Sequence, residues 1–282
     1  MLNTMHWSDL EKAFSRAAAL SLSKRKLALA LPALILCGLF IVFCKAVAFE
    51  ANEWVAMSLI FLPVLLSSGV LLALGVLLIR IHHHEAKQLA LDIKKLIRSS
   101  ADLVIGTSYL AIFPVLAYLL LWIVLGVFFL LKEIPYLGDF FSVVFSFGPF
   151  LLIFGSFCLC ALNLGLLFFV APAAALQSLQ KTSLAKRILQ LVSKKMFDSL
   201  VLLFIACLPA SIIGGILCLS AMLTNVSFSI AEKSLSVALE WFFIMLPFCA
   251  ILSPTVIFFF NFSAESYQLL QGSGHSSRSS EE

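Results

Sequence analysis

Hydrophobic and polar residues alternate along this chain in long blocks, and six of the apolar blocks are long enough to cross a membrane. They cover about residues 27–49, 54–79, 103–131, 140–170, 200–223 and 237–262. A spanning helix needs about 20 mostly apolar residues, because each residue rises about 1.5 Å through a hydrocarbon core about 30 Å thick. Membrane β-strands instead alternate over about 10 residues. The pattern therefore predicts an all-α, polytopic membrane protein with six transmembrane helices.

Three basic segments separate pairs of these apolar runs. Residues 1–26, 80–107 and 171–198 each carry five Lys or Arg. Their apolar residues recur at spacings of three and four, which is typical of an amphipathic helix, and the first such helix is expected over residues 7–20, lying on the membrane. We expect these helices to bind anionic lipid headgroups or a partner protein. The basic residues assigned to this role are Lys94, Lys95, Arg98, Lys186, Arg187, Lys194 and Lys195.

The alternation of basic segments and pairs of apolar runs divides the chain into three similar hairpin units within one transmembrane domain. The units cover residues 1–79, 80–170 and 171–262. Each second span contains a proline followed six residues later by a small residue, at Pro63, Pro149 and Pro247. One unit cannot bury its own small-residue face, so three packed units are the expected stable object. The prolines either kink helices for packing or help to line a central cavity, together with Asn163, the one strongly polar residue deep in a span.

Basic residues in short loops stay on the cytoplasmic side of a membrane. The distribution of Lys and Arg therefore predicts that both termini and the basic segments are cytoplasmic, with three short turns outside. Residues 263–282 have too little apolar surface to fold and are expected to form a disordered cytoplasmic tail. The sequence Ala46-Val47-Ala48 is similar to a signal-peptidase site, but the apolar stretch before it exceeds the usual 7–15 residues, which favours a retained span.

Composition supports a membrane protein: 62% of the residues are hydrophobic and 12% are charged, against roughly 45–50% and 25% in soluble domains. All seven cysteines fall inside apolar runs, so no disulfide framework is expected. The triplet His82-His83-His84 ends the second span and invites a metal site, but adjacent residues on a helix diverge, so an interfacial polar tract is preferred. We expect no metal, no cofactor and no nucleic-acid partner.

The sequence contains no catalytic signature. There is no nucleotide-binding glycine loop, zinc-protease motif or nucleophile elbow, and no chain of buried acids is evident. Glu240 is expected to reach water at the outer end of its span. Asp102 and Asp198 stand at helix starts, where a carboxylate is favourable. An enzyme is therefore not expected, and no catalytic residue is assigned.

The basic segment after residue 170 carries a family resemblance. Ala171-Pro172, Ala185-Lys186-Arg187 and Lys194-Lys195-Met196-Phe197 resemble bacterial six-span membrane-domain families related to the membrane part of glycerophosphoryl diester phosphodiesterases. Gln177 replaces the family's acid, Ile188 replaces its serine, and the soluble catalytic domain is absent, so no catalysis is implied. The resemblance implies a protein of the bacterial inner membrane.

Two functions are compatible with these patterns. The first is a non-enzymatic scaffold or accessory component that binds lipid or partner proteins. The alternative is a permease or channel for a small solute passing near Asn163, and an intramembrane enzyme ranks third.

Overall fold

The computed structural model describes residues 7–50, 53–87, 98, 106, 109–132, 147–176, 196–223 and 235–276. All regular elements in these ranges are helices. They are α1 (Trp7–Ala19), α2 (Lys24–Glu50), α3 (Glu53–Ala86), the 3₁₀ turn η1 (Tyr109–Ala111), α5 (Ile112–Lys132), α7 (Gly148–Leu176), α9 (Met196–Leu223) and α10 (Leu235–Ser276).

Five of these helices, α2, α3, α7, α9 and α10, are long and apolar enough to cross a membrane, with apolar stretches of 25 to 31 residues. In α5 the apolar stretch is shorter and covers Ile112–Val124. The expected all-α fold with several membrane-length apolar helices is therefore confirmed for the described residues, whereas the expected number of six spans stays a prediction.

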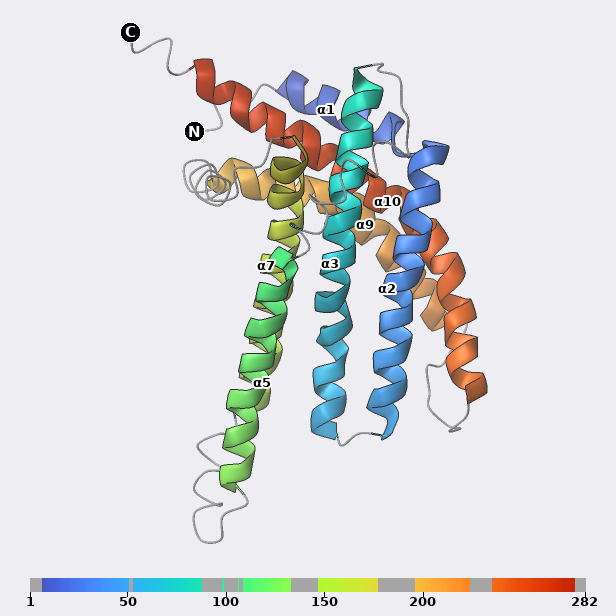
Figure 1. Cartoon of the computed structure of the whole chain (residues 1–282), viewed down its shortest axis with the longest axis vertical. Helices are drawn as coiled ribbons and strands as arrows, with labels where there is room; N and C mark the ends of the chain where they lie inside the picture. Colours follow the sequence, from blue (N-terminus) through green and yellow to red (C-terminus); the bar gives the residue numbers. More distant parts are fainter. Residues whose placement is uncertain are drawn as a thin grey trace.

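Several helix ends that adjoin the basic segments lie toward one end of the molecule, although α5 begins farther from it (Figure 1). Figure 1 shows α2 beginning, and α3 and α7 ending, toward the end where α1 lies, and α9 begins toward that end too. Helices α2 and α3 are antiparallel neighbours. We call this the basic end of the molecule.

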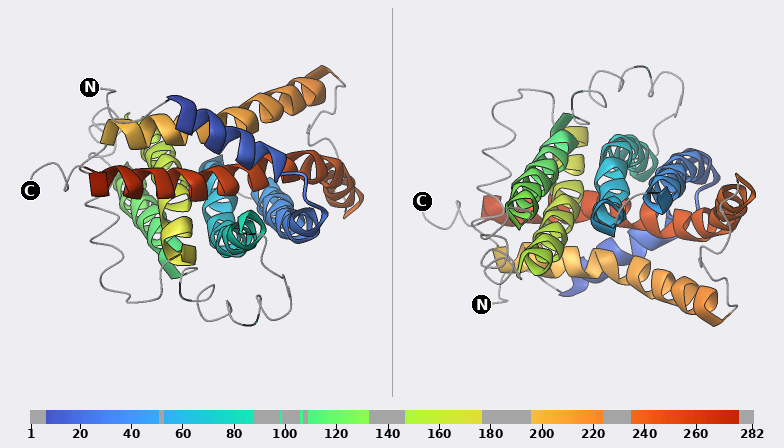
Figure 2. Two further views of the ribbon diagram at one scale, coloured as in Figure 1. Left: turned by 90° about the horizontal axis from the view of Figure 1, so that it is seen from above. Right: turned by 90° about the horizontal axis from the view of Figure 1, so that it is seen from below.

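Helices α9 and α10 depart from a simple upright bundle. In Figure 2, α9 runs strongly inclined to α2 and α3. Helix α10 changes direction along its length, and its C-terminal part runs across the basic ends of α3 and α7 (Figures 1 and 2). Pro247 and Pro254 lie inside α10, and proline is a common cause of helix bends because it removes a backbone hydrogen bond.

The buried core is concentrated toward the basic end. It joins Ala13 and Ala17 of α1 to residues 72–79 of α3, 167–175 of α7 and 257–270 of α10. A Cβ atom on Gly75 would lie 2.3 Å from a ring carbon of Phe260, so α3 approaches α10 closely there. Much of the remaining helical surface, on α5 and α9 in particular, exposes large apolar side chains, which suits a lipid environment.

Three helices extend beyond their expected ends. Helix α3 continues past residue 79 through the histidine triplet, α7 continues past residue 170, and α10 continues past residue 262. The expectation of a disordered tail is therefore wrong for residues 263–276. The reason is tertiary packing, because Ala264, Ser266 and Tyr267 are buried there.

Helix α7 passes through Pro172 because α10 compensates for the lost hydrogen bond. Proline has no N–H to donate to the carbonyl four residues earlier, which here belongs to Phe168. The Ser263 hydroxyl of α10 donates to that carbonyl at 2.6 Å. Ser263, which was expected to lie in the tail, thus supplies the hydrogen bond that the Phe168 carbonyl of α7 lacks.

Helix α1 forms where the sequence predicts it, but its partner is different. We expected its apolar face to lie on the membrane. Instead Ala13 and Ala17 are buried, α1 packs on α10, and the Phe14 ring lies 5.0 Å from that of Phe258. Part of the apolar face of α1 therefore covers protein.

Candidate functional site

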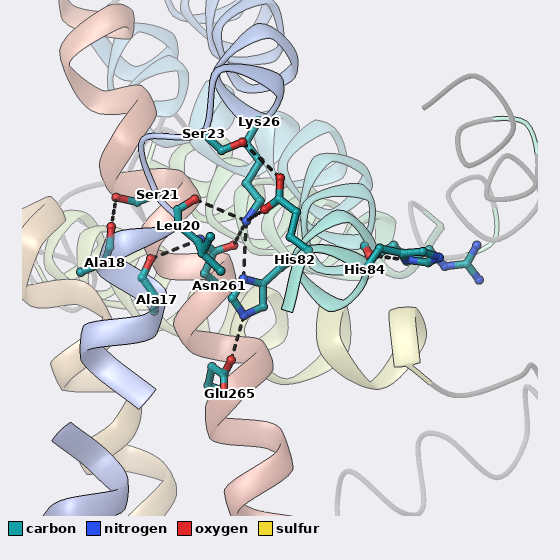
Figure 3. A network of polar contacts seen from close by, with 12 residues as sticks. Ala17, Ala18, Leu20, Ser21, Ser23, Lys26, His82, His84, Asn261 and Glu265 are labelled. Atoms are coloured by element: carbon teal, nitrogen blue, oxygen red, sulfur yellow. Dashed lines mark hydrogen bonds and ion pairs between the residues drawn. The ribbon is translucent and has the colours of Figure 1, made fainter. Parts of the chain in front are cut away.

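A cluster of charged and polar side chains, most of them buried, lies where α1, α2, α3 and α10 meet at the basic end (Figure 3). Helix α1 contributes Arg16, and Ser23 lies just before α2. The remaining members are Lys26 from α2, His82 and Glu85 from α3, and Asn261 and Glu265 from α10. We call this set the ionic cluster.

Lys26 occupies the centre of the ionic cluster, and its side chain is 0% exposed. Its Nζ lies 2.9 Å from Oε2 of Glu85. It donates to Oδ1 of Asn261 at 3.1 Å and to the backbone carbonyl of Leu20 at 3.4 Å. One ammonium therefore joins α2 to α3, to α10 and to the turn that follows α1.

His82 continues the network from Lys26 toward α10. Its Nδ1 lies 3.4 Å from Nζ of Lys26, and its Nε2 lies 2.9 Å from Oε1 of Glu265. A protonated lysine only donates, so Nδ1 is the ring atom that can accept from Lys26, while Nε2 faces the carboxylate of Glu265. His82 therefore connects the ammonium of α2 to a carboxylate of α10.

The two carboxylates each have a second partner. Glu265 accepts from Nη1 of Arg16 at 3.3 Å, and Glu85 accepts from the hydroxyl of Ser23 at 3.1 Å. The buried Lys26 and the half-exposed Arg16 therefore face two carboxylates, Glu85 and Glu265, around His82. Burying an isolated charge is very costly, and this pairing explains how the charged groups are accommodated.

Asn261 ties α1 to the cluster from the opposite side. Its side chain is fully buried. Its Oδ1 accepts from Lys26 while its Nδ2 donates to the carbonyl of Ala17 at 3.3 Å. Two backbone carbonyls thus accept hydrogen bonds from side chains of the cluster: that of Ala17 in the last turn of α1, and that of Leu20, the residue after the helix. The cluster therefore fixes the end of α1 onto α2 and α10.

The arrangement is a set of contacts between helices. Figure 3 shows Lys26 pointing toward His82 and Asn261, and His82 pointing toward Glu265. Among the described residues, no group of three His, Cys, Asp or Glu side chains is placed to hold a metal ion. Buried ion pairs contribute little net stability compared with apolar packing, but removing one partner is strongly destabilising. The ionic cluster therefore restricts which helix faces can meet.

The histidine triplet is divided by the fold. His82 is buried in the cluster, whereas His84 makes its contact at 2.8 Å with the carbonyl of Arg80, one turn earlier in α3. The expectation that adjacent histidines diverge is confirmed. The expectation that the triplet ends the helix is wrong, because His82 packs against α2 and α10 and holds α3 in helical form to Ala86.

The basic residues expected to bind lipid or a partner lie almost entirely outside the described residues. Arg98 is described and is exposed. The others are Lys94, Lys95, Lys186, Arg187, Lys194 and Lys195. Their role stays a prediction.

The prolines expected to kink the even spans are not in equivalent positions. Pro63 and Pro247 lie inside α3 and α10. Pro149 instead lies in the first turn of α7, which begins at Gly148. An early helical position suits proline because its missing N–H would have no partner there. The residues before Phe147 in this expected span lie outside the described residues, so the expectation that Pro149 kinks or breaks the span stays a prediction.

Asn163 lies midway along α7 and is buried, at 5% exposure. It lines a small cavity of about 10 Å³ with Ser68, Leu72, Ala111, Leu166, Leu167 and Val170. This volume is about the minimum needed to hold one water molecule. The cavity joins α3 to α7, and it is far smaller than a passage for a solute.

The ionic cluster was missed by sequence reasoning because its members come from distant parts of the chain. Lys26 and Asn261 are 235 positions apart, and His82 and Glu265 are 183 apart. Two local signals pointed to it. Asn261 and Glu265 are four apart, and His82 and Glu85 are three apart, so each pair shares one helix face at the end of an apolar run.

The fold is helical, and its five long apolar helices are compatible with a multi-pass integral membrane protein. Buried charges join these helices near one end. A scan against protein-family models, a search of curated proteins and a search of solved structures each found no match. The motif at Ala171-Pro172 lies inside α7, not at its end.

Proposed function

We propose that the chain is a six-span protein of a bacterial inner membrane with both termini cytoplasmic. Helix α5 supplies the sixth span: it has 21 residues, which is about 31 Å at 1.5 Å per residue. The gathering of the basic ends at one end of the molecule supports the topology, because it lets the basic segments occupy a single membrane face (Figure 1).

We further propose that the protein is a non-enzymatic scaffold or accessory component that binds anionic lipid or a partner protein through its basic cytoplasmic segments. The observation that carries this proposal is the ionic cluster. Its charged side chains are engaged with one another between helices, as expected of groups that hold a surface in place. A fixed basic end gives the neighbouring basic segments a stable base from which to bind.

The alternative of a permease or channel has less support. Its expected polar residue, Asn163, adjoins a cavity of about 10 Å³, which accommodates about one water molecule. Flux measurements in proteoliposomes test it directly. Solute flux that is lost on Asn163→Leu would favour transport over the scaffold.

Lipid binding is tested with full-length protein purified from membranes that contain phosphatidylglycerol. We expect glutamine substitution of Lys186, Arg187, Lys194 and Lys195 to lower the amount of co-purified anionic lipid. Each cation near an anionic surface contributes about 1 kcal/mol. The matched control replaces Lys132 and Lys233, which belong to the proposed outer turns. Equal lipid retention in both variants would contradict the lipid-binding proposal.

Partner binding is the second arm of the test. Crosslinking in intact cells, followed by purification of the full chain, measures whether a membrane protein is captured specifically. We expect capture to depend on the same four basic residues and to persist in the control. A protein that neither retains anionic lipid nor captures a specific partner is not a scaffold of this kind.

The topology has its own test. Single cysteines at positions 90 and 180, in a background without the native cysteines, should resist a membrane-impermeant thiol reagent added to intact cells. Cysteines at positions 52 and 228 should react. The reverse pattern would overturn the cytoplasmic placement of the basic segments.

A further inference from the structure

Within the described helices, the Asn163 side chain is buried, lines a cavity and has unmet hydrogen-bonding capacity. A primary amide offers two donors and one acceptor oxygen. Within the part of the chain that the structure describes, the Asn163 side chain has no recorded hydrogen bond. At 5% exposure, this side chain has little contact with solvent or lipid.

The buried serine hydroxyl groups of α3 and α7 instead find hydrogen-bond acceptors within their own helices. Ser67 donates to the carbonyl of Pro63 at 2.7 Å, and Ser156 donates to that of Leu152 at 2.7 Å. Each acceptor belongs to the same helix as the serine. An asparagine amide has more hydrogen-bonding capacity than one such contact provides.

The cavity beside Asn163 contains the partner that the amide lacks. Ser68 of α3 lines the same cavity, and its hydroxyl donates to the carbonyl of Leu65 at 2.5 Å. Since the hydroxyl proton is used in that bond, the oxygen is left to accept. The other lining residues, Leu72, Ala111, Leu166, Leu167 and Val170, have apolar side chains.

We propose that this cavity is a binding site for a single water molecule that bridges Asn163 of α7 to Ser68 of α3. The water donates one hydrogen bond to the Ser68 oxygen and forms a second hydrogen bond with the Asn163 amide. The cavity volume of about 10 Å³ matches one molecule, and two polar partners meet the lower limit for a buried water. A larger polar ligand does not fit.

The bridge gives Asn163 a role that does not rest on scaffold or transport function. Asn163 and Ser68 each lie 16 residues into their helices, so the water joins two spans near mid-helix. Such a contact holds α3 against α7 in surroundings where other polar partners are scarce. It also explains how an amide is retained there.

A double-mutant cycle measures the bridge in full-length protein unfolded by SDS in mixed micelles. The two changes are Ser68→Ala and Asn163→Leu. Either change removes the bridge, so the second should cost little after the first. We expect a coupling of about fivefold in the unfolding equilibrium constant, the size of one typical hydrogen bond.

Ser67 provides the matched control for this cycle. It adjoins Ser68 in α3 and is also buried, but it does not line the cavity. Ser67→Ala and Asn163→Leu should therefore be additive. Additive effects for Ser68 as well would overturn the proposal, because the two side chains would then share no ligand.

A density map of the unmodified protein supplies a test that needs no variant to fold. At a resolution that shows ordered water, we expect one peak within about 2.7–3.2 Å of both side chains. A resolved but empty cavity would also overturn the proposal.

Discussion

Replacement of Lys26 by methionine is the sharpest test of the ionic cluster. Methionine keeps most of the length of the side chain but removes the ammonium. Glu85 then keeps only its bond from Ser23, while the side-chain oxygen of Asn261 and the carbonyl of Leu20 each lose a donor. Nδ1 of His82 also loses its contact with the ammonium, so one substitution leaves four groups on three segments short of a partner.

The magnitude follows from the burial of these groups. Removing one partner of a buried ion pair costs about 3–5 kcal/mol. The Glu85 side chain is 15% exposed, so water can partly solvate it after the change. We therefore expect a loss near the lower limit, about 3 kcal/mol, measured as the free energy of unfolding in SDS.

Lys24 is the matched control, because it lies one turn or less from Lys26 on the same helix and is exposed. Lys24→Met should change stability little. Adding Glu85→Gln to Lys26→Met should restore part of the loss, since it removes the unpaired charge. Equal stability of the two methionine variants would refute the reasoning that Lys26 joins the helices.

Two further substitutions test packing between α10 and its neighbours. Gly75→Ala places a methyl group against a buried phenyl ring of α10 and should cost about 1–3 kcal/mol in unfolding free energy. Gly214→Ala is the control, because its added methyl group would have no atom within 4 Å, and it should be neutral or slightly stabilising. An equal loss of stability at both positions would contradict the close approach of α3 to α10. Ser263→Ala removes the donor to the carbonyl freed by Pro172 and should cost about 1–3 kcal/mol, measured by the same unfolding assay. Ser253→Ala is its control, because Ser253 is equally buried but bonds within its own helix, and a similar loss there would contradict the compensation.

The sequence could predict the helices because apolar length and periodicity are local properties. The amphipathic helix at residues 7–20 and the long apolar helices were found in this way. Helix ends were less accurate, because polar residues such as His82 and Glu265 look like membrane boundaries until their partners are known. Their burial depends on contacts with other helices, which no local pattern reports.

The candidate site could not be predicted from the sequence for the same reason. A lysine at the start of a span is ordinarily a topology signal, and nothing near Lys26 in the chain marks it as different from Lys24. What distinguishes them is helix rotation: Lys26 faces α3 and α10, whereas Lys24 faces outward. Asn163 was identified as unusual from its depth alone, but the size of its cavity depends on how closely α3 and α7 pack.

The ionic cluster also sets an order for biogenesis. Chains are synthesised from the N-terminus, so α1, α2 and α3 leave the ribosome long before Asn261 and Glu265 exist. Until α10 arrives, His82 lacks the carboxylate that its Nε2 contacts, and α1 lacks the helix that covers Ala13 and Ala17. The packing of the first helix can therefore be completed only after the last helix has been synthesised.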